Sequence, residues 1–260
     1  MLKKFFCAAA VSAALICSSA QALETSVAPK VTSLGMDAPK TGLYVGNSFT
    51  YYNCGMGGYL RAMTGKDKWI GRMITISAGA LSFHDVESYL AKHDLDPYDK
   101  NERKFDVVFL QGQSNEPIHP KRKANFKKYL KKHIETIRSH GSIPVVVDTW
   151  ALQDKPEQTR QLAEAITTEA NLNNAMVAPV GLAFAESLKV RPDLILHAPD
   201  KRHPSSAGSL MYASVLYAVL FKESPEGKTV KTVCEKPLKD EDVRHIQRTA
   251  WKTVKTFFGW

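Results

Sequence analysis

Asp106-Val107-Val108-Phe109-Leu110 is a short, almost continuously apolar run, and Pro144-Val145-Val146-Val147 is a second one. Runs of this length, rich in β-branched residues and without polar alternation, are typical of strands buried on both faces. Such strands occur mainly in parallel sheets that helices cover on both sides. The two runs therefore predict the central strands of an α/β sheet.

Outward from these runs, short β-branched segments alternate with longer amphipathic ones, the pattern of a parallel sheet with crossover helices. The candidate strands are 42–45, 72–77, 106–111, 143–149 and 176–179. The candidate helices are 57–63, 84–92, 121–140, 155–171 and 181–190, followed by one after Ser205-Ser206 and one over about 240–257. The pattern predicts a three-layer, doubly wound sheet of about five parallel strands with helices on both faces.

The first 22 residues have the features of a secretory signal peptide. Lys3 and Lys4 precede an apolar stretch over residues 5–16, and Ala20-Gln21-Ala22 fits a small-x-small cleavage site. An uncleaved anchor is the alternative, but the apolar stretch is short for a bilayer span of about 20 residues. We expect a mature chain from Leu23, periplasmic or secreted from a bacterium, that forms a single domain over 23–260 without an integral membrane segment.

The net charge and the cysteine content say little about the binding partners of the protein. The net charge of +9 falls to +7 without the two lysines of the signal. The remaining lysines cluster at 121–132 and 222–255, where solvated helix faces explain them, and no base-reading motif accompanies them, so we expect no nucleic-acid partner. Cys54 and Cys234 remain after signal removal, and either a disulfide or two buried thiols fits the sequence.

Ser48 directly follows the first candidate strand, in Leu43-Tyr44-Val45-Gly46-Asn47-Ser48-Phe49, and Asp200-Lys201-Arg202-His203 lies near the other end of the chain. A serine hydroxyl becomes a good nucleophile when a histidine takes its proton and a carboxylate orients that histidine. Alone, Gly-Asn-Ser is a common turn and Asp-x-x-His can be a helix cap. Their order, together with Gly79 and residues 112–115 after the second and third strands, favours a catalytic site with Ser48, Asp200 and His203.

Three blocks of this sequence resemble the SGNH or GDSL-type hydrolase superfamily: Gly46-Asn47-Ser48-Phe49-Thr50, Ser77-Ala78-Gly79-Ala80-Leu81 and Asp200-Lys201-Arg202-His203. The first block resembles a bacterial branch of that superfamily. The resemblance implies a flavodoxin-like fold and an esterase, acetylesterase, thioesterase or lipase activity. It also implies an oxyanion hole formed by the backbone N–H groups of Ser48 and Gly79.

The third block departs from the usual Gly-x-Asn-Asp and stands as Gly112-Gln113-Ser114-Asn115-Glu116. Its side-chain amide donor is therefore either Gln113 or Asn115, with Gln113 slightly preferred. From the resemblance and the residue chemistry together, we expect an extracytoplasmic serine esterase that needs no metal or organic cofactor. Its substrate is expected to be a small-molecule or glycan ester, such as O-acetyl groups on a carbohydrate. The alternatives are a non-catalytic glycan-binding or envelope-assembly protein, and a lipase or thioesterase for longer acyl chains.

Other aromatic and histidine residues carry weaker expectations. The histidines show no metal-ligand spacing. His133 and His140 are expected on an exposed basic helix, and His84 and His197 are candidates for the surroundings of the site because of their position in the sequence. Four aromatic residues could stack on sugar rings or pack in the core: Tyr51, Tyr52, Trp69 and Trp150.

Overall fold

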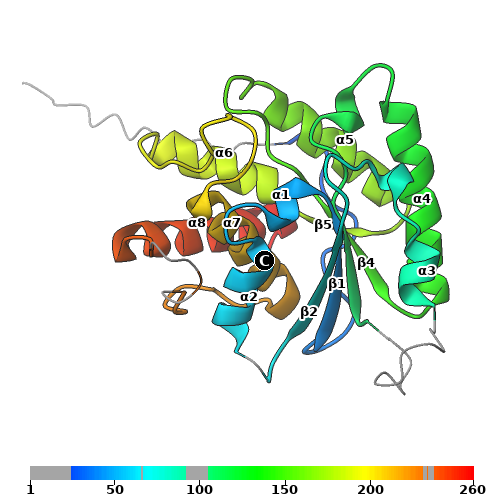
Figure 1. The fold of residues 1–260 in the computed structure, drawn as a ribbon, viewed down its shortest axis with the longest axis horizontal. Helices are drawn as coiled ribbons and strands as arrows, with labels where there is room; N and C mark the ends of the chain where they lie inside the picture. The colour runs from blue at the N-terminus through cyan, green and yellow to red at the C-terminus, as the bar shows by residue number, and fades with distance from the viewer. Residues whose placement is uncertain (1–24, 66, 92–104, 231–232, 234–236) are drawn as a thin grey trace, which may run out of the picture.

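Five strands form one sheet in the order β2-β1-β3-β4-β5, and every neighbouring pair is parallel (Figure 1). The computed structural model describes residues 25–65, 67–91, 105–230, 233 and 237–260. The strands are β1 Thr41–Gly46, β2 Ile70–Thr75, β3 Val107–Leu110, β4 Ile143–Val147 and β5 Met176–Ala178. This is the flavodoxin-like order, and its direction of winding reverses between β1 and β3. The predicted fold class is confirmed, and ligands of such sheets bind at the carboxyl ends of these two strands.

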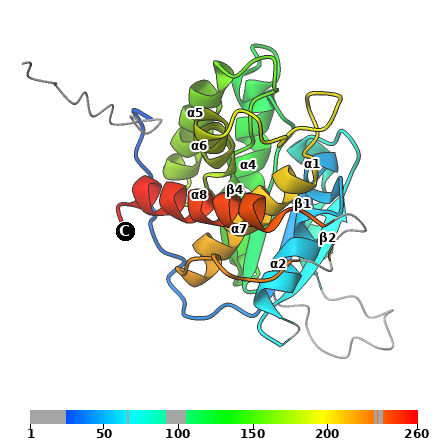
Figure 2. The same cartoon turned by 90° about the vertical axis from the view of Figure 1, so that its left-hand side faces the viewer.

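Helices cover both faces of the sheet (Figures 1 and 2). One face carries α2 Met56–Thr64, α6 Val180–Val190, α7 Ser206–Phe221 and α8 Asp240–Phe258, and the other carries α3 Val86–Leu90, α4 Lys123–Ser139 and α5 Gln158–Leu172. Three short helices follow the first three strands: α1 Ser48–Tyr51, η1 Leu81–Phe83 and η2 Glu116–Ile118. The carboxyl edge of the sheet is therefore built from short, tightly turned segments.

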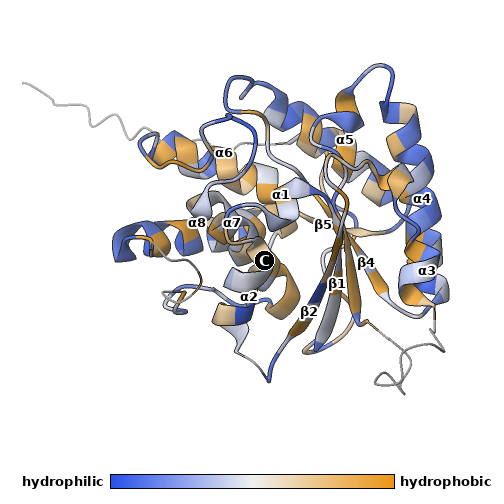
Figure 3. Ribbon diagram, in the orientation of Figure 1, coloured by the Kyte–Doolittle hydropathy of each residue, from blue (hydrophilic) through white to orange (hydrophobic). Residues whose placement is uncertain are grey.

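Burial on both faces explains why the central strands do not alternate apolar and polar residues. Tyr44 and Phe109 pack into the cluster under α2 and α7, whereas Leu43 and Val108 pack into the cluster under α4, so both faces of β1 and β3 are buried. Helix α7 is buried along most of its length because it lies between the sheet and α8. The outer helices α4 and α8 alternate apolar and hydrophilic residues around their axes (Figure 3).

Most predicted elements begin and end within about two residues of the observed ones. The largest differences are the short helices α1, η1 and η2, which were not predicted, and the helix expected over 84–92, of which the described structure forms α3 Val86–Leu90; Lys92 lies outside the described residues. The signal-peptide prediction also falls outside them. Within the described ranges, no helix combines the length and the apolarity that a membrane span requires.

Candidate active site

Ser48, His203 and Asp200 form a hydrogen-bonded chain at the carboxyl edge of the sheet. The Ser48 Oγ lies 2.8 Å from the His203 Nε2, although the two residues are 155 positions apart. On the other side of the ring, the His203 Nδ1 lies 2.5 Å from the Asp200 Oδ2. The structure therefore brings together the three residues that the sequence singled out, in the order that nucleophile activation requires.

A tight loop presents Asp200 and His203 on the same side. The Asp200 Oδ1 accepts hydrogen bonds from the backbone N–H groups of Arg202 and His203, at 3.0 and 2.9 Å. Lys201 between them has a φ of 61°, in the left-handed region. Burial raises the pKa of Asp200, but the hydrogen bonds from the His203 side chain and from these N–H groups outweigh it and bring the pKa to about 2. Asp200 is consequently an anion at neutral pH, which favours a proton on the facing Nδ1 and leaves Nε2 to accept from Ser48.

Asn47 fixes the position of Ser48. Its Oδ1 accepts from the Phe49 N–H and caps α1, so that Ser48 is the first helical residue. Its Nδ2 donates to the carbonyl oxygens of Gly79 and Gly112, at 2.9 and 3.2 Å. Because these carbonyls belong to the loops after β2 and β3, one buried amide ties all three loops of the site together.

Gln111 is a second buried polar residue behind Ser48. Its Oε1 accepts from the Asn47 N–H at 3.1 Å and from the Thr50 Oγ1 at 3.0 Å. A Cβ at Gly46 would lie 2.7 Å from that same Oε1, so only glycine leaves room for this contact. The sequence did signal Gln111, because it is a polar residue at the end of an otherwise apolar strand, but its role was missed.

The N–H of Gly79 is already used inside its own loop. It donates to the Ile76 carbonyl oxygen at 2.9 Å, and a Cβ at Gly79 would lie 2.9 Å from the same oxygen. Close packing therefore explains this glycine, and in this geometry its N–H is not available for the oxyanion role that the resemblance implies. The N–H of Ala78 has no acceptor within the described part of the chain, and Ala78 holds a φ of 55°. Such left-handed backbone is uncommon outside glycine and often occurs at functional sites.

Arg122 holds both candidate amide donors of the third block. Its Nη2 donates to the Asn115 Oδ1 at 2.7 Å, and its Nη1 donates to the Gln113 Oε1. With each amide oxygen bound to the guanidinium, the NH₂ group of each side chain is left to donate elsewhere. Sequence reasoning missed Arg122 because it lies within a run of basic residues that resembles a solvated helix face.

The four candidate aromatic residues divide into two pairs. Trp69 and Trp150 are 2% and 1% exposed, so they pack in the core and cannot stack on a sugar. Tyr51 and Tyr52 are both 39% exposed, at the end of the short helix that begins at Ser48. The Tyr51 hydroxyl lies 2.7 Å from the Ser77 Oγ, which connects the first and second loops at the surface.

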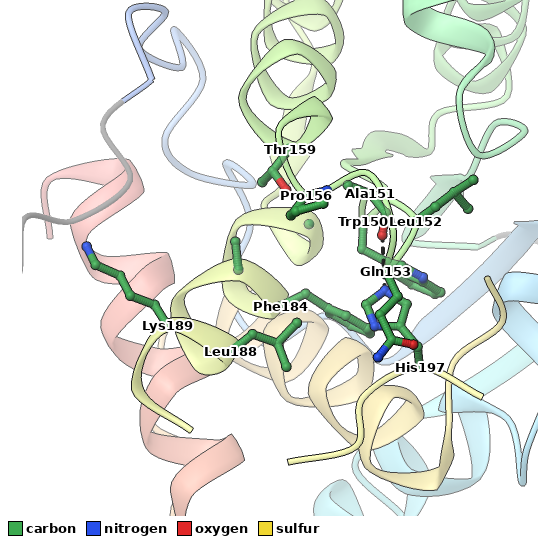
Figure 4. A pocket seen from close by; sticks show the side chains of 12 residues that line it. Trp150, Ala151, Leu152, Gln153, Pro156, Thr159, Phe184, Leu188, Lys189 and His197 are labelled. Atoms are coloured by element: carbon green, nitrogen blue, oxygen red, sulfur yellow. Dashed lines mark hydrogen bonds between the residues drawn. The ribbon is translucent and has the colours of Figure 1, made fainter. Parts of the chain in front are cut away.

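A cavity of about 430 Å³ lies beside α6 and the start of α5 (Figure 4). His197 lines it, with its Nε2 3.0 Å from the Ala151 carbonyl oxygen, and burial lowers the pKa of this histidine. Trp150 stacks on Phe49 with 4.5 Å between ring centroids and on Phe184 with 4.4 Å. Trp150, which lines the cavity, therefore also packs against the helix that carries Ser48.

Two other histidines and Cys54 are each in a distinct environment. His133 is buried, with its Nε2 2.8 Å from the Leu81 carbonyl oxygen, so the prediction of an exposed position was wrong; its place one turn after Leu130 puts it on the inner face of α4. His84 is buried, with its ring edge-on to that of Tyr89, and it interacts with the backbone of Gly46, so it lies in the surroundings of the site as predicted. Cys54 is disulfide-bonded, whereas Cys234 lies outside the described residues.

Comparisons with known proteins bear on the fold. No protein-family model matches the chain, and no curated protein matches it in sequence. Among solved structures, the chain is similar to a protein described as an SGNH hydrolase from Slackia heliotrinireducens, with a TM-score of 0.53, 22% identity and coverage of 70% of this chain and 99% of the other. The chain is also similar to a member of the lipolytic G-D-S-L family from Veillonella parvula DSM 2008, with a TM-score of 0.56, 15% identity and coverage of 71% of this chain and 100% of the other.

An acetylxylan esterase from Geobacillus stearothermophilus is also similar, with a TM-score of 0.51, 18% identity and coverage of 71% of this chain and 96% of the other. At identities this low, the likeness concerns the arrangement of the strands and helices. The chain therefore has the three-layer α/β fold of the SGNH hydrolases.

Proposed function

We propose that the protein is an extracytoplasmic serine esterase that hydrolyses small acyl esters, with O-acetyl groups on carbohydrate as its substrate class. The observation that carries the proposal is the 2.8 Å contact between the Ser48 Oγ and the His203 Nε2, because it joins a nucleophile to a base whose other nitrogen faces an ionised carboxylate. The fold shared with an acetylxylan esterase supports the substrate class by analogy. The signal-like residues 1–22 support the location.

In the first half of the reaction, the Ser48 Oγ attacks the ester carbonyl carbon and its proton passes to the His203 Nε2. The tetrahedral intermediate then collapses: the bond to the alcohol oxygen breaks, and the alcohol leaves with the proton from Nε2. Asp200 orients the imidazole and stabilises its cationic form throughout. The product of this half is an acyl group bound to Ser48.

In the second half, a water molecule gives a proton to the His203 Nε2 and its oxygen attacks the acyl carbon. The carboxylic acid leaves, and Ser48 regains its proton from His203. For the oxyanion of both intermediates, we assign the N–H of Ser48, the N–H of Ala78 in place of that of Gly79, and the side-chain amide of Gln113 or Asn115. Each such donor contributes about 3 to 4 kcal/mol to lowering the barrier.

The test is hydrolysis of p-nitrophenyl acetate and of acetylated xylo-oligosaccharides by the mature chain. We expect turnover of both, and loss of turnover in Ser48→Ala. The matched control is Ser139→Ala, because Ser139 is exposed at the carboxyl end of α4, away from the carboxyl ends of the strands. Faster cleavage of p-nitrophenyl octanoate than of the acetate would overturn the substrate class. Binding of acetylated glycan without turnover would overturn the enzyme proposal.

A further inference from the structure

The imidazole of His203 is covered on one face by the ring of Tyr52. The two ring centroids lie 4.3 Å apart with an interplanar angle of 21°, which is a stacked arrangement. Phe49 contacts the same imidazole with its edge, at 5.8 Å and 75°. Since Ser48 and Asp200 already occupy the two ring nitrogens, Tyr52 contributes a contact that the hydrogen-bonded chain does not account for.

Backbone and side-chain bonds hold Tyr52 in this place. Its N–H donates to the Ser48 carbonyl oxygen at 3.0 Å, and its own carbonyl oxygen accepts from the Ser209 Oγ of α7 at 3.0 Å. The next residue, Asn53, donates through its Nδ2 to the Pro204 carbonyl oxygen, 2.5 Å away. The turn after α1 is thus hydrogen-bonded to Pro204, which directly follows His203, and to Ser209 in α7.

The backbone after Tyr52 is in an uncommon conformation. Asn53, Cys54 and Gly55 have consecutive φ values of 44°, 66° and 61°. Left-handed backbone at non-glycine residues persists where surrounding contacts determine it. Here those contacts include the bond from Asn53 to Pro204 and the disulfide at Cys54. These contacts therefore fix the turn that places the Tyr52 ring over His203.

The chemistry of the proposed reaction gives this ring a use, because His203 becomes a cation in each half of it. The face of a tyrosine ring carries a negative quadrupole and attracts a cation within about 6 Å of its centroid. Asp200 is the charged group that is hydrogen-bonded to the imidazole. The side chains of Phe49 and Ser48, which also contact the imidazole, are uncharged. Lys201 and Arg202 are exposed on the same loop as His203.

We infer that Tyr52 is a positioning residue of this site: its ring orients the His203 imidazole and stabilises the imidazolium that forms when Ser48 gives up its proton. The inference rests on the proposed esterase function. It differs from a role in substrate binding, in which the exposed Tyr52 ring would contact a sugar and leave His203 unaffected. It also differs from simple shielding, which any apolar side chain of similar size would provide.

The test compares Tyr52→Leu, Tyr52→Phe and Tyr52→Trp, with pH profiles of kcat/KM for p-nitrophenyl acetate. In Tyr52→Leu, we expect kcat to fall about fivefold and the midpoint of the acid limb to move down by about half a pH unit, because the imidazolium loses its π partner. Tyr52→Phe and Tyr52→Trp retain a ring face and should keep the wild-type midpoint. Tyr129→Leu is the matched control, since Tyr129 lies beside His133 on α4, outside the site.

A second measurement is independent of turnover. In a Ser48→Ala background, NMR titration of the His203 ring protons should give a lower midpoint with Tyr52→Leu than with Tyr52 or Tyr52→Phe. This shift would support the inference even if the protein proved not to be an esterase. Superimposable midpoints for all variants, or equal shifts in Tyr52→Leu and Tyr52→Phe, would overturn it. So would a change confined to KM for acetylated glycan, which would make Tyr52 a substrate contact.

Discussion

The side-chain amide of Asn47 donates to the carbonyl oxygen of Gly79, 2.9 Å away, and so fastens the loop that carries Ser48 to the loop that follows β2. The same nitrogen reaches the Gly112 carbonyl at 3.2 Å, and Asn47 is 2% exposed. A carboxylate in this position would face two carbonyl oxygens without water. The arrangement therefore requires an amide at position 47, and it makes the geometry of the site sensitive to this one side chain.

Asn47→Asp should destabilise the protein by about 2 to 4 kcal/mol at pH 7, because a buried charge would face two acceptors. Burial would raise the pKa of the introduced carboxyl above its unfolded value of about 4, so the loss should grow as pH rises from there. Urea unfolding at pH 5 and pH 8 measures it. Asn173→Asp, which removes one amide donor at the accessible end of α5, is the control. Equal stability of Asn47→Asp and wild type at pH 8 would contradict the account.

Gln113→Ala should lower kcat about 100-fold or more, the usual effect of losing an oxyanion donor, with Asn115→Ala having the smaller effect. Arg122→Lys should lower kcat about tenfold, because a lysine cannot hold both amide oxygens as the guanidinium does. Lys123→Ala, at the next position on α4, should leave kcat unchanged. A larger loss in Asn115→Ala than in Gln113→Ala would transfer the donor role to Asn115.

Asp200→Asn should lower kcat about 10⁴-fold while the protein stays folded, because the amide favours the wrong tautomer of His203. The pKa of Asp200 is lowered to about 2, so its stabilising contribution is present above the unfolded value of 3.8 and is lost as pH falls towards 2. In wild type, the free energy of unfolding should therefore contain a contribution that decreases as pH falls from 3.8 to about 2. Asp200→Asn should lack this contribution, which acid unfolding monitored by circular dichroism measures. A variant with wild-type kcat would exclude Asp200 from the mechanism.

Asp148→Asn should stabilise the protein at alkaline pH. Asp148 follows β4 and is buried; its Oδ2 accepts from the Leu182 N–H at 3.3 Å, and its Oδ1 has no partner among the described residues. Burial raises the pKa of Asp148 to about 8, so its protonated form contributes stability below the unfolded value of 3.8, and this contribution is lost as pH rises to about 8. Thermal unfolding should show the gain of Asp148→Asn increasing from pH 5 to pH 9. A pH-independent difference would contradict the assignment.

The sheet and most of its helices were predictable because each strand is a short local run with its own signature. The buried strands β3 and β4 were recognisable from their short, almost continuously apolar runs. Helix α1 could not be predicted in this way, since four residues are too few to show a helical period.

The candidate site was predictable only in part. Ser48, Asp200 and His203 could be named from local patterns, but their mutual distances depend on packing between segments 155 positions apart. Arg122 and Tyr52 had no distinctive local signal, because one belongs to a basic run and the other to a pair of exposed tyrosines. Gly79 was assigned a donor role from its place in a motif, whereas the hydrogen bond that occupies its N–H depends on the local turn.

Labelling of the folded protein with a fluorophosphonate probe, followed by peptide mapping, tests the central claim most directly. The probe reacts with serines that an adjacent base activates, so we expect modification of Ser48 and its loss in His203→Ala. A folded protein that resists the probe, or one labelled at a different serine, would contradict the claim that His203 activates Ser48.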